Sequence, residues 1–305
     1  MIGRREYITA DVFTDVRFGG NQLAVVLDGT GLTTDEMQAI TREFNYAEST
    51  FVLPPENPAH AARVRIFTIA HEMPFAGHPT VGTAFVLAAL GRIPLTGDET
   101  RIVLELNVGP TPVVIRAVDG VPVFTQLTTA TLPEVGPPPP TRATLAAMLG
   151  LEANDLGSGT SAPQAVSCGF PFLIVPVKDR AALAKARLKL DLYESTLANW
   201  WAKDVYVFTR TGCDDGFDVH ARMFGPGAGV PEDPATGSAA AALAGYLAAR
   251  ESAKDGTFSW AIAQGLEMGR PSRIEIEADK AAGAVSAVRV GGRSVLVARG
   301  ELLAE

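Results

Sequence analysis

The sequence predicts an α+β protein of two pseudo-symmetric domains, each a curved, barrel-like, mostly antiparallel sheet around a central helix. Three observations predict this fold class. Each half of the 305-residue chain contains many short, apolar, β-branched segments, each half contains one helix that is apolar on almost every side, and one pattern occurs at the start of both helices. A flat two-layer sandwich leaves part of such a helix exposed, whereas a strongly curved sheet buries all of it.

The strands are expected where Val, Ile, Phe and Thr gather in short runs, because these side chains suit a pleated, half-buried surface. The segments predicted in the first half are Tyr7–Phe13, Leu23–Leu27, Thr50–Leu53, Arg63–Thr68, Ile102–Leu106, Thr111–Ala117 and Val121–Gln126. Those predicted in the second half are Phe172–Val177, Val205–Thr209, Asp218–Phe224, Arg273–Glu277, Val285–Val290 and Ser294–Ala298. Each half is therefore expected to consist mainly of short strands with few helices.

The predicted helices are one that follows the capping-box pattern Thr33–Glu36, one from about Pro79 to Leu90, and one from about Thr236 to Arg250. In the first of them, Met37, Ile40 and Phe44 follow at helical spacing. The other two are apolar almost all round, which indicates that they are buried.

A proline-rich segment separates the two halves. It runs from Thr131 to Arg142 and contains Pro133 and the run Pro137–Pro140. Proline fixes φ and removes a backbone donor, so a helix or a central strand is not expected here. We predict an extended, semi-rigid linker, with the first domain ending at residue 130 and the second beginning at residue 131.

An internal repeat is indicated by two pairs of matching segments. The run His78–Ala84 matches Asp233–Ala239, 155 residues further on: a polar residue, Pro, two variable residues, Gly, Thr or Ser, and Ala. Upstream, Arg65-Ile66-Phe67 matches Arg222-Met223-Phe224 at nearly the same offset. Chance similarity of two helix starts rich in small residues is the alternative. One repeated strand–loop–helix unit explains both pairs together.

The charge and cysteine content exclude several classes of protein. With 26 basic and 34 acidic residues, the net charge of -8 argues against nucleic acid or an anionic membrane as partner. The run Ala239–Ala249 is too short to span a bilayer, and the N-terminus lacks the apolar region of a signal peptide. Cys168 and Cys213 cannot form a disulfide framework, and no zinc-ligand spacing occurs. A soluble, cytoplasmic protein without a metal site is expected.

Both buried helices begin with residues that suit an anion site. A helix N-terminus presents unpaired N–H groups and a partial positive charge, which attract a carboxylate or a phosphate. Gly77 and Gly237 allow close approach of the backbone, and Thr83 and Ser238 add hydroxyl donors. Simple helix capping is the alternative for either motif alone. Because the motif is duplicated, we expect both helix starts to face a shared cleft between the two domains.

Candidate groups for proton transfer lie in the same regions. His78 and Asp233 occupy matching positions of the repeat, and Glu48 precedes an apolar strand, where partial burial would raise its pKa. Each also has a structural alternative: a solvent-facing strand end for Glu48 and a hydrogen-bonded core histidine for His78. The glycine-rich segment Gly225–Gly229 lacks a nucleotide-binding pattern and is predicted to be a flexible loop, with a lid over the cleft as one role.

The chain resembles the phenazine-biosynthesis isomerase-like proteins, which share the diaminopimelate epimerase-like fold. The motifs that carry this resemblance are Asp11-Val12-Phe13-Thr14, Gly20-Asn21, Glu48-Ser49-Thr50-Phe51, Pro74–Thr80, Glu232–Ala239, Gln264-Gly265 and Gly269-Arg270-Pro271-Ser272. They extend over almost the whole chain, and the segments PFAGHPT and EDPATGSA are highly specific in this order.

The resemblance implies an isomerase without metal or organic cofactor. The characterised isomerase of the family acts on trans-2,3-dihydro-3-hydroxyanthranilate and moves a proton within the ring. By this resemblance Glu48 is the acid/base, while the groups that support it and hold a carboxylate-bearing substrate are His78, Asp233, Ser238, Asn21 and the backbone N–H groups near Gly77 and Gly237. Gln22 stands where the family usually has proline, a departure from the family pattern at this turn.

The resemblance also implies that a last strand, about 293–305, returns to the first domain, which leaves 131–292 as the second. It further implies a homodimer and a structural role for Gly269–Ser272. Related racemases use two cysteines at the two helix starts, and neither cysteine of this chain is there, so a two-thiol mechanism is disfavoured. The open alternatives are an epimerase or racemase of an amino or hydroxy acid, for example with Glu48 and Asp233 as a mixed pair, and a non-catalytic metabolite-binding protein.

Overall fold

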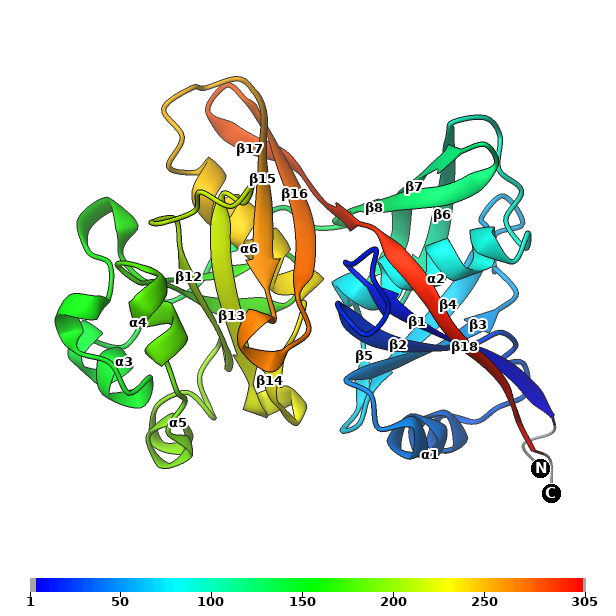
Figure 1. Cartoon of the computed structure of the whole chain (residues 1–305), viewed down its shortest axis with the longest axis horizontal. Helices are drawn as coiled ribbons and strands as arrows, with labels where there is room; N and C mark the ends of the chain where they lie inside the picture. The colour runs from blue at the N-terminus through cyan, green and yellow to red at the C-terminus, as the bar shows by residue number, and fades with distance from the viewer. Residues whose placement is uncertain (1–3, 304–305) are drawn as a thin grey trace. The chain divides into compact units, whose positions relative to one another are not determined.

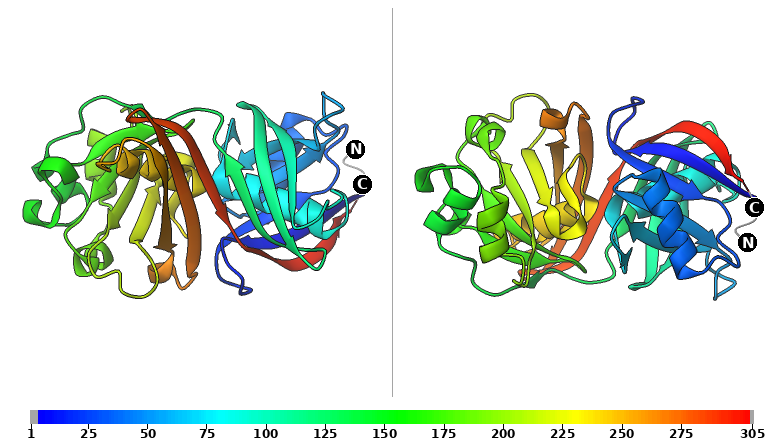
Figure 2. Two further views of the ribbon diagram at one scale, coloured as in Figure 1. Left: turned by 90° about the horizontal axis from the view of Figure 1, so that it is seen from above. Right: turned by 90° about the horizontal axis from the view of Figure 1, so that it is seen from below.

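The computed structural model of the chain describes residues 4–303, which form two compact units (Figure 1). The first unit ends at Ala130 and takes up the chain again at Val290, and the second spans Thr131–Arg289. In both units curled, mostly antiparallel strands surround one central helix, α2 (Gly77–Ala89) in the first and α6 (Gly237–Ala248) in the second (Figure 2). The predicted fold class, α+β with curved sheets, is confirmed.

The first unit closes its sheet with strands from both ends of the chain. Besides α2, its elements are β1 (Arg5–Val12), β2 (Asn21–Val26), α1 (Thr34–Phe44), β3 (Glu48–Leu53), β4 (Ala62–Thr68), β5 (Glu72–Met73), β6 (Glu99–Leu106), β7 (Gly109–Val118), β8 (Val121–Thr128) and β18 (Ser294–Leu302). Strand β1 pairs antiparallel with β2 on one side and with β18 on the other. The predicted capping box of α1 is confirmed, since Thr33 accepts from the backbone of Glu36 and Glu36 accepts in return.

The second unit adds small helices outside its sheet. Besides α6, its elements are β9 (Glu134–Val135), α3 (Arg142–Met148), η1 (Ala153–Asp155), η2 (Gly159–Ser161), β10 (Gln164–Ser167), β11 (Pro171–Pro176), α4 (Arg180–Lys185), α5 (Leu190–Thr196), β12 (Asp204–Thr209), β13 (Val219–Gly225), η3 (Pro226–Ala228), β14 (Val230–Asp233), β15 (Gly256–Gln264), η4 (Leu266–Met268) and β16 (Ser272–Ala281). The strand β17 (Ala284–Gly292) crosses the boundary between the units. Figure 1 shows α3, α4 and α5 together beside β12.

Both central helices are buried along their length, as predicted. Every residue of α2 from Gly77 to Ala88 and every residue of α6 is buried. Gly82 explains how closely α2 packs on the sheet, because a Cβ at this position would lie 2.5 Å from Val12 Cγ2 and 2.6 Å from Leu23 Cδ2. Small residues on these helices let the strands approach from all sides, which the curvature of the sheet requires.

The predicted repeat is confirmed as a repeat of sheet topology. In the first unit β2 and β3 are parallel, β4 is antiparallel to β3 and β5, and β4 and β6 are parallel again. In the second unit β11, β12, β13, β14 and β15 make the same sequence of pairings. The matching arginines make matching contacts: Arg65 pairs with Glu72 and lies over Phe67, and Arg222 pairs with Glu232 and lies over Phe224.

The predicted match between His78 and Asp233 is wrong. Asp233 pairs with Met223 of β13, and the residue in the same place of the first unit is Met73, which pairs with Ile66 of β4. Three residues then lead to α2 and to α6, so Gly77 corresponds to Gly237 and the next residue, His78, corresponds to Ser238.

The sequence pattern was misleading because proline and small residues begin helices in more than one way. Pro79 is the third residue of α2, where no N–H is needed, whereas Pro234 lies in the loop before α6. From Met223 to its partner Asp233 the chain advances ten positions, three more than the seven from Ile66 to its partner Met73, and η3 (Pro226–Ala228) lies in the longer connection. The predicted flexible loop Gly225–Gly229 is therefore a strand end and a 3-10 turn.

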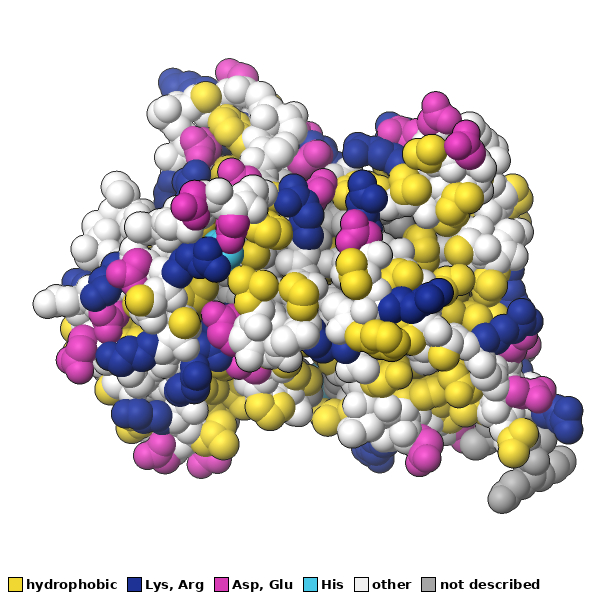
Figure 3. Space-filling model, viewed as in Figure 1, with side chains coloured by type: hydrophobic (Ala, Val, Ile, Leu, Met, Phe, Trp, Pro, Cys, Tyr) yellow, Lys and Arg dark blue, Asp and Glu magenta, His cyan; other side chains and the backbone are white. Residues whose placement is uncertain are grey.

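Between residues 4 and 303, no helix is long and apolar enough to cross a membrane. On the face in Figure 3, basic and acidic side chains are interspersed. A surface of mixed sign fits the modest net charge of -8.

Candidate active site

Three of the predicted site residues lie together in the first unit. Glu48 is the first residue of β3, His78 is the second residue of α2 and Asn21 is the first residue of β2. His78 Nε2 lies 3.4 Å from Glu48 Oε2, and Asn21 Nδ2 lies 3.1 Å from His78 Nδ1. The parallel pairing of β2 with β3 sets Leu23 opposite Glu48 and so brings the two strand starts to the helix. The Glu48 side chain is 16% exposed, whereas that of His78 is 3% exposed.

His78 is a neutral imidazole. Burial lowers its pKa from the ordinary 6.5 to about 3, against a smaller opposing effect from the Gln22 backbone. When the amide of Asn21 donates to Nδ1, the single ring proton lies on Nε2, the nitrogen nearest Glu48. Nε2 makes no hydrogen bond within the described part of the chain. In this tautomer Nε2 is a buried donor that makes no hydrogen bond to any residue described and lies 3.4 Å from the Glu48 carboxylate, so it marks a place where an acceptor fits.

Replacing His78 by Gln is expected to flatten the pH dependence of stability. In the wild type the native state leaves His78 neutral down to about pH 3, whereas the unfolded chain protonates it below pH 6.5. The unfolded state therefore binds more protons in this window, and stability falls as the pH falls through it, by at most about 1.4 kcal/mol per pH unit for one proton. Urea unfolding between pH 5 and pH 7 measures the slope. The exposed His71→Gln variant is the matched control, and an H78Q slope equal to the wild-type slope would contradict the assignment.

The start of α2 offers backbone donors beside this pair. Gly77 is the first helical residue, and the N-cap residue Ala76 makes no side-chain cap. The N–H groups of the first turn have no partner within the helix and carry the positive end of its dipole. Thr83, which was predicted to be a hydroxyl donor of the site, instead joins α2 to β3. It is fully buried, and its Oγ1 lies 2.9 Å from Thr50 Oγ1.

The other predicted site residues lie in the second unit. Asp233 ends β14 and is buried, while Gly237 and Ser238 begin α6. Thr236 is the N-cap residue of α6, but its hydroxyl donates to Asp233 Oδ2 and does not cap the helix. The start of α6 therefore resembles that of α2, with backbone N–H groups that no N-cap side chain satisfies.

A fully buried amide, Gln264, holds this segment in place. Its Oε1 accepts from Tyr206 Oη at 3.0 Å and from the Thr236 N–H at 3.3 Å. Its Nε2 donates to the Asp233 carbonyl at 2.8 Å and to Thr236 Oγ1 at 3.1 Å. All of these bonds agree on one orientation of the amide. Because the Thr236 hydroxyl accepts from Gln264, its own proton goes to Asp233 Oδ2.

Two motifs of the second unit support the same segment. Gly265 has a positive φ of 77°, and a Cβ there would lie 2.6 Å from the Pro234 carbonyl oxygen. Ser272 Oγ donates to the Pro234 and Arg270 carbonyls, at 3.0 Å each. Gln264-Gly265 and Gly269–Ser272 thus form the support of the loop that carries Asp233. Thr236, Tyr206 and Gln264 were not predicted as site residues, since no local pattern distinguishes a buried polar network from ordinary strand residues.

Neither cysteine is prepared to act as a thiolate base. Burial raises the pKa of Cys168 to about 12, and its Sγ lies 3.5 Å from the Ala241 carbonyl. Burial, with the charge of Asp215 next, also raises the pKa of Cys213. Reactive cysteines need a lowered pKa, so the raised values argue against either thiol as a base. Among the residues described, no cluster of His, Cys, Asp and Glu suited to a metal ion occurs.

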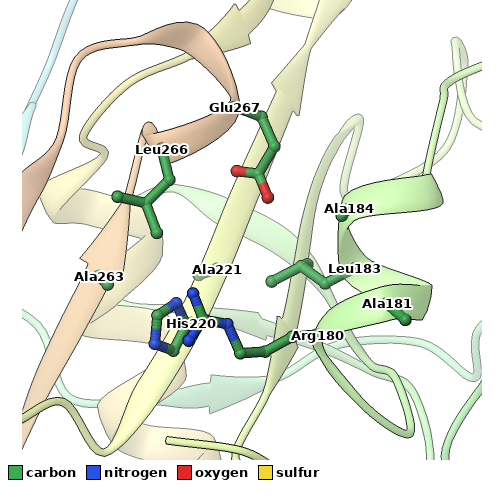
Figure 4. Close-up of a pocket in the computed structure, with 9 residues that line it drawn as sticks. All are labelled: Arg180, Ala181, Leu183, Ala184, His220, Ala221, Ala263, Leu266 and Glu267. Atoms are coloured by element: carbon green, nitrogen blue, oxygen red, sulfur yellow. The ribbon is translucent and has the colours of Figure 1, made fainter. Parts of the chain in front are cut away.

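A separate pocket of about 390 Å³ lies in the second unit (Figure 4). It is lined by Arg180, Ala181, Leu183, Ala184, His220, Ala221, Ala263, Leu266 and Glu267, from α4, β13, β15 and η4. Asp215 contacts two of the residues that line it, Arg180 through Nη1 and His220 through Nε2, at 3.0 Å each. None of the predicted site residues lines this pocket.

Comparison with known proteins identifies relatives along the whole chain. The family model described as phenazine biosynthesis-like protein matches residues 10–300. The chain is 42% identical to an uncharacterized isomerase of Mesorhizobium japonicum, covering 98% of both proteins. It is 37% identical to the trans-2,3-dihydro-3-hydroxyanthranilate isomerase of Pseudomonas aeruginosa, covering 96% of this chain and 98% of that one. A PhzF-family phenazine biosynthesis protein of Bacillus anthracis superimposes with a TM-score of 0.86 at 28% identity, over 99% of each chain.

Proposed function

Because the chain belongs to the phenazine biosynthesis-like protein family, and relatives of it are named isomerases, we propose that it is an isomerase that moves a proton within a small carboxylate-bearing metabolite. The observation that carries the proposal is the pair of Glu48 and His78. A partly exposed carboxylate beside a buried, neutral imidazole is a proton acceptor with a proton donor next to it.

In the proposed reaction Glu48 takes a proton from one carbon of the substrate and returns it to another. His78 stays neutral and donates its Nε2–H to the developing negative charge or to the Glu48 carboxylate. An imidazole with a pKa of about 3 is not protonated at neutral pH, so it stabilises charge by hydrogen bonding. The reaction conserves the oxidation state of the substrate, so acid–base groups of the chain are sufficient for it and we propose no cofactor.

The substrate carboxylate is proposed to bind where backbone N–H groups are available. In the first unit this is the first turn of α2 at Gly77. In the second unit the first turn of α6 at Gly237, with Ser238 Oγ as an additional donor, is a separate candidate for binding the substrate. Asn21 holds the ring of His78, and Asp233 is proposed to bind a polar group of the substrate. The positive end of a helix explains how an acidic substrate can be held by a protein of net charge -8.

The first compound to test is the substrate of the named relative, trans-2,3-dihydro-3-hydroxyanthranilate. Incubation with the wild-type protein in D₂O, followed by NMR, is expected to show its conversion to the isomer. If Glu48 alone carries the proton, part of the substrate-derived hydrogen is kept in the product on one face. A product of inverted configuration with complete deuterium incorporation indicates epimerisation by two groups. Absence of turnover of this compound and of a panel of small amino and hydroxy acids would contradict the proposal.

A further inference from the structure

Four buried polar side chains of the second unit form one hydrogen-bonded network. Asp233 ends β14, Thr236 is the N-cap residue of α6, Gln264 ends β15, and Tyr206 lies in β12. Gln264 begins the motif Gln264-Gly265, to which the resemblance gives no role. A buried polar network is costly unless its members satisfy one another, and a satisfied network holds its members in a single arrangement. The arrangement in this network can be derived atom by atom.

The backbone fixes the orientation of the Gln264 amide. Oε1 lies 3.3 Å from the backbone nitrogen of Thr236, which can only donate. Nε2 lies 2.8 Å from the backbone oxygen of Asp233, which can only accept. A flipped amide would set two donors against each other on one side and two acceptors against each other on the other side. Only one orientation of the amide therefore satisfies both backbone groups.

This orientation decides where the two hydroxyl protons lie. Gln264 Oε1 carries no proton, so Tyr206 Oη donates to it, at 3.0 Å. Gln264 Nε2 donates to Thr236 Oγ1 at 3.1 Å, and the Thr236 hydroxyl in turn donates to Asp233 Oδ2. The donors thus follow one direction, from Tyr206 through Gln264 and Thr236 to a carboxylate. Hydrogen bonds in such a chain polarise and strengthen one another.

The last bond of this chain fixes the plane of the Asp233 carboxylate. The terminal torsion of an aspartate side chain has only broad, shallow preferences, so the side chain alone does not set that plane. The donor at Oδ2 is held firmly, because Gln264 binds both the N–H and the hydroxyl of Thr236. Gln264 therefore determines, through Thr236, how the carboxylate of Asp233 is turned.

We propose that Thr236 and Gln264 are positioning residues that act through Asp233: Gln264 holds the Thr236 hydroxyl, and this hydroxyl turns the carboxylate toward a hydroxyl or ammonium group of the substrate. A carboxylate can only accept, so the substrate must supply a donor group. The contact with the substrate rests on the proposed function, whereas the direction of the chain is a property of the free protein. No proton is transferred along the chain.

An NMR experiment tests the fixed hydroxyl without any substrate. The full-length protein, labelled at threonine ¹³Cβ, is observed in an equal mixture of H₂O and D₂O. A hydroxyl that exchanges slowly gives two Cβ signals, one for OH and one for OD, and we expect this pair for Thr236. The internal control is the exposed Thr257, whose hydroxyl also donates to a carboxylate, that of Asp279, at 2.6 Å. It should give one averaged signal, and an averaged signal for Thr236 as well overturns the proposal.

The kinetics of two variants at one position test the role in binding. Thr236→Val keeps the shape but removes the hydroxyl, and it is expected to raise KM about tenfold while kcat changes less than threefold. Thr236→Ser keeps the hydroxyl and should return KM to within threefold of the wild-type value. A merely structural role would reduce the fraction of folded protein, which lowers the apparent kcat and leaves KM unchanged. Urea unfolding of both variants measures that fraction, and equal KM values for Val and Ser overturn the proposal.

A double-mutant cycle tests whether Thr236 acts through Asp233. In the Asp233→Ala background, Thr236→Val is expected to change KM no further, and a further tenfold rise overturns the proposal. If Asp233→Ala does not fold, the comparison of Val with Ser decides alone. Gln264→Met should raise KM as Thr236→Val does. Its matched control is Gln38→Met, at a buried glutamine of the first unit that donates to the Thr68 carbonyl at 2.8 Å, and it should leave KM within threefold.

The two kinds of measurement separate this inference from the proposed function. If the paired Thr236 signals are observed and no substrate is found, the proposed function fails and the directed chain stands. If a substrate is turned over and Thr236→Val leaves its KM unchanged, the proposed function stands and the positioning role fails.

Discussion

Replacing Glu48 by Gln is expected to slow turnover by about 10²–10⁴-fold, the usual contribution of a general acid/base. Glutamine keeps the size of the side chain and an oxygen that can accept from His78 Nε2, which lies 3.4 Å from the carboxylate in the wild type. It cannot take up a proton from carbon. The measurement is the rate of isomerisation of trans-2,3-dihydro-3-hydroxyanthranilate, or of the substrate found by the panel, with the appearance of deuterium from D₂O followed in the same sample.

The matched control is Glu43→Gln on the exposed side of α1, which removes the same charge from the same unit and should keep the wild-type rate. Urea unfolding of both variants separates a loss of folding from a loss of chemistry. A Glu48→Gln variant that is folded and turns over at the wild-type rate would falsify the role of Glu48 as the proton carrier. If turnover falls while deuterium exchange into the substrate continues, the proton is removed by another group.

The second large effect is expected in stability, from Arg222→Met. The Arg222 side chain is 2% exposed, makes two bonds to Glu232 and donates to three carbonyls at the end of α4. Methionine fills much of the space but leaves Glu232 and these carbonyls without their donor. Breaking a buried ion pair on one side costs about 3–5 kcal/mol of the free energy of unfolding. Tryptophan fluorescence follows this transition, since Trp200, Trp201 and Trp260 all lie in the second unit.

The repeat supplies the control for this prediction. Arg65 makes the same pair with Glu72, but its side chain is 18% exposed and its other bond is to Thr34 Oγ1. Arg65→Met, followed by circular dichroism, is therefore expected to lose less. Adding Glu232→Gln to Arg222→Met should recover part of the loss, because the charge left unpaired is removed. A loss for Arg65→Met equal to that for Arg222→Met would contradict the importance of burial.

The elements that could be predicted from the sequence are those whose signal lies in neighbouring residues. Apolar strands, the capping box at Thr33 and the two buried helices follow from patterns within about fifteen residues, and all of them are present. The strand β15 (Gly256–Gln264) was missed, because its first residues are polar and its burial comes from parallel pairing with β13. The small helices α4 and α5 were also missed, since six and seven residues hold too little periodicity to be distinguished.

The candidate site was predictable to a similar degree. The proximity of Glu48 to His78 agrees with a hypothesis formed from residue types alone, but its geometry depends on β2 and β3 being parallel. The repeat was predicted, but its alignment at the helix starts was wrong by five residues. The two aligned segments are similar in composition, whereas their places in the sheet topology differ. Asp204 comes directly before the predicted strand Val205–Thr209 and was not predicted to be a site residue. Only the paired registers of two sheets show that it matches Glu48, since each lies three residues before the strand residue that faces the matching arginine.

The pairing of β1 with β18 makes the first unit depend on residues that are synthesised after the whole of the second unit. Until Ser294–Leu302 is synthesised, β1 has β2 on one side and an open edge on the other, and open edges invite pairing with other chains. The second unit is one continuous stretch, Thr131–Arg289, and needs no residue made after it. During translation the middle of the chain can therefore become resistant to proteases before its beginning does, against the usual order in which the N-terminal part folds first.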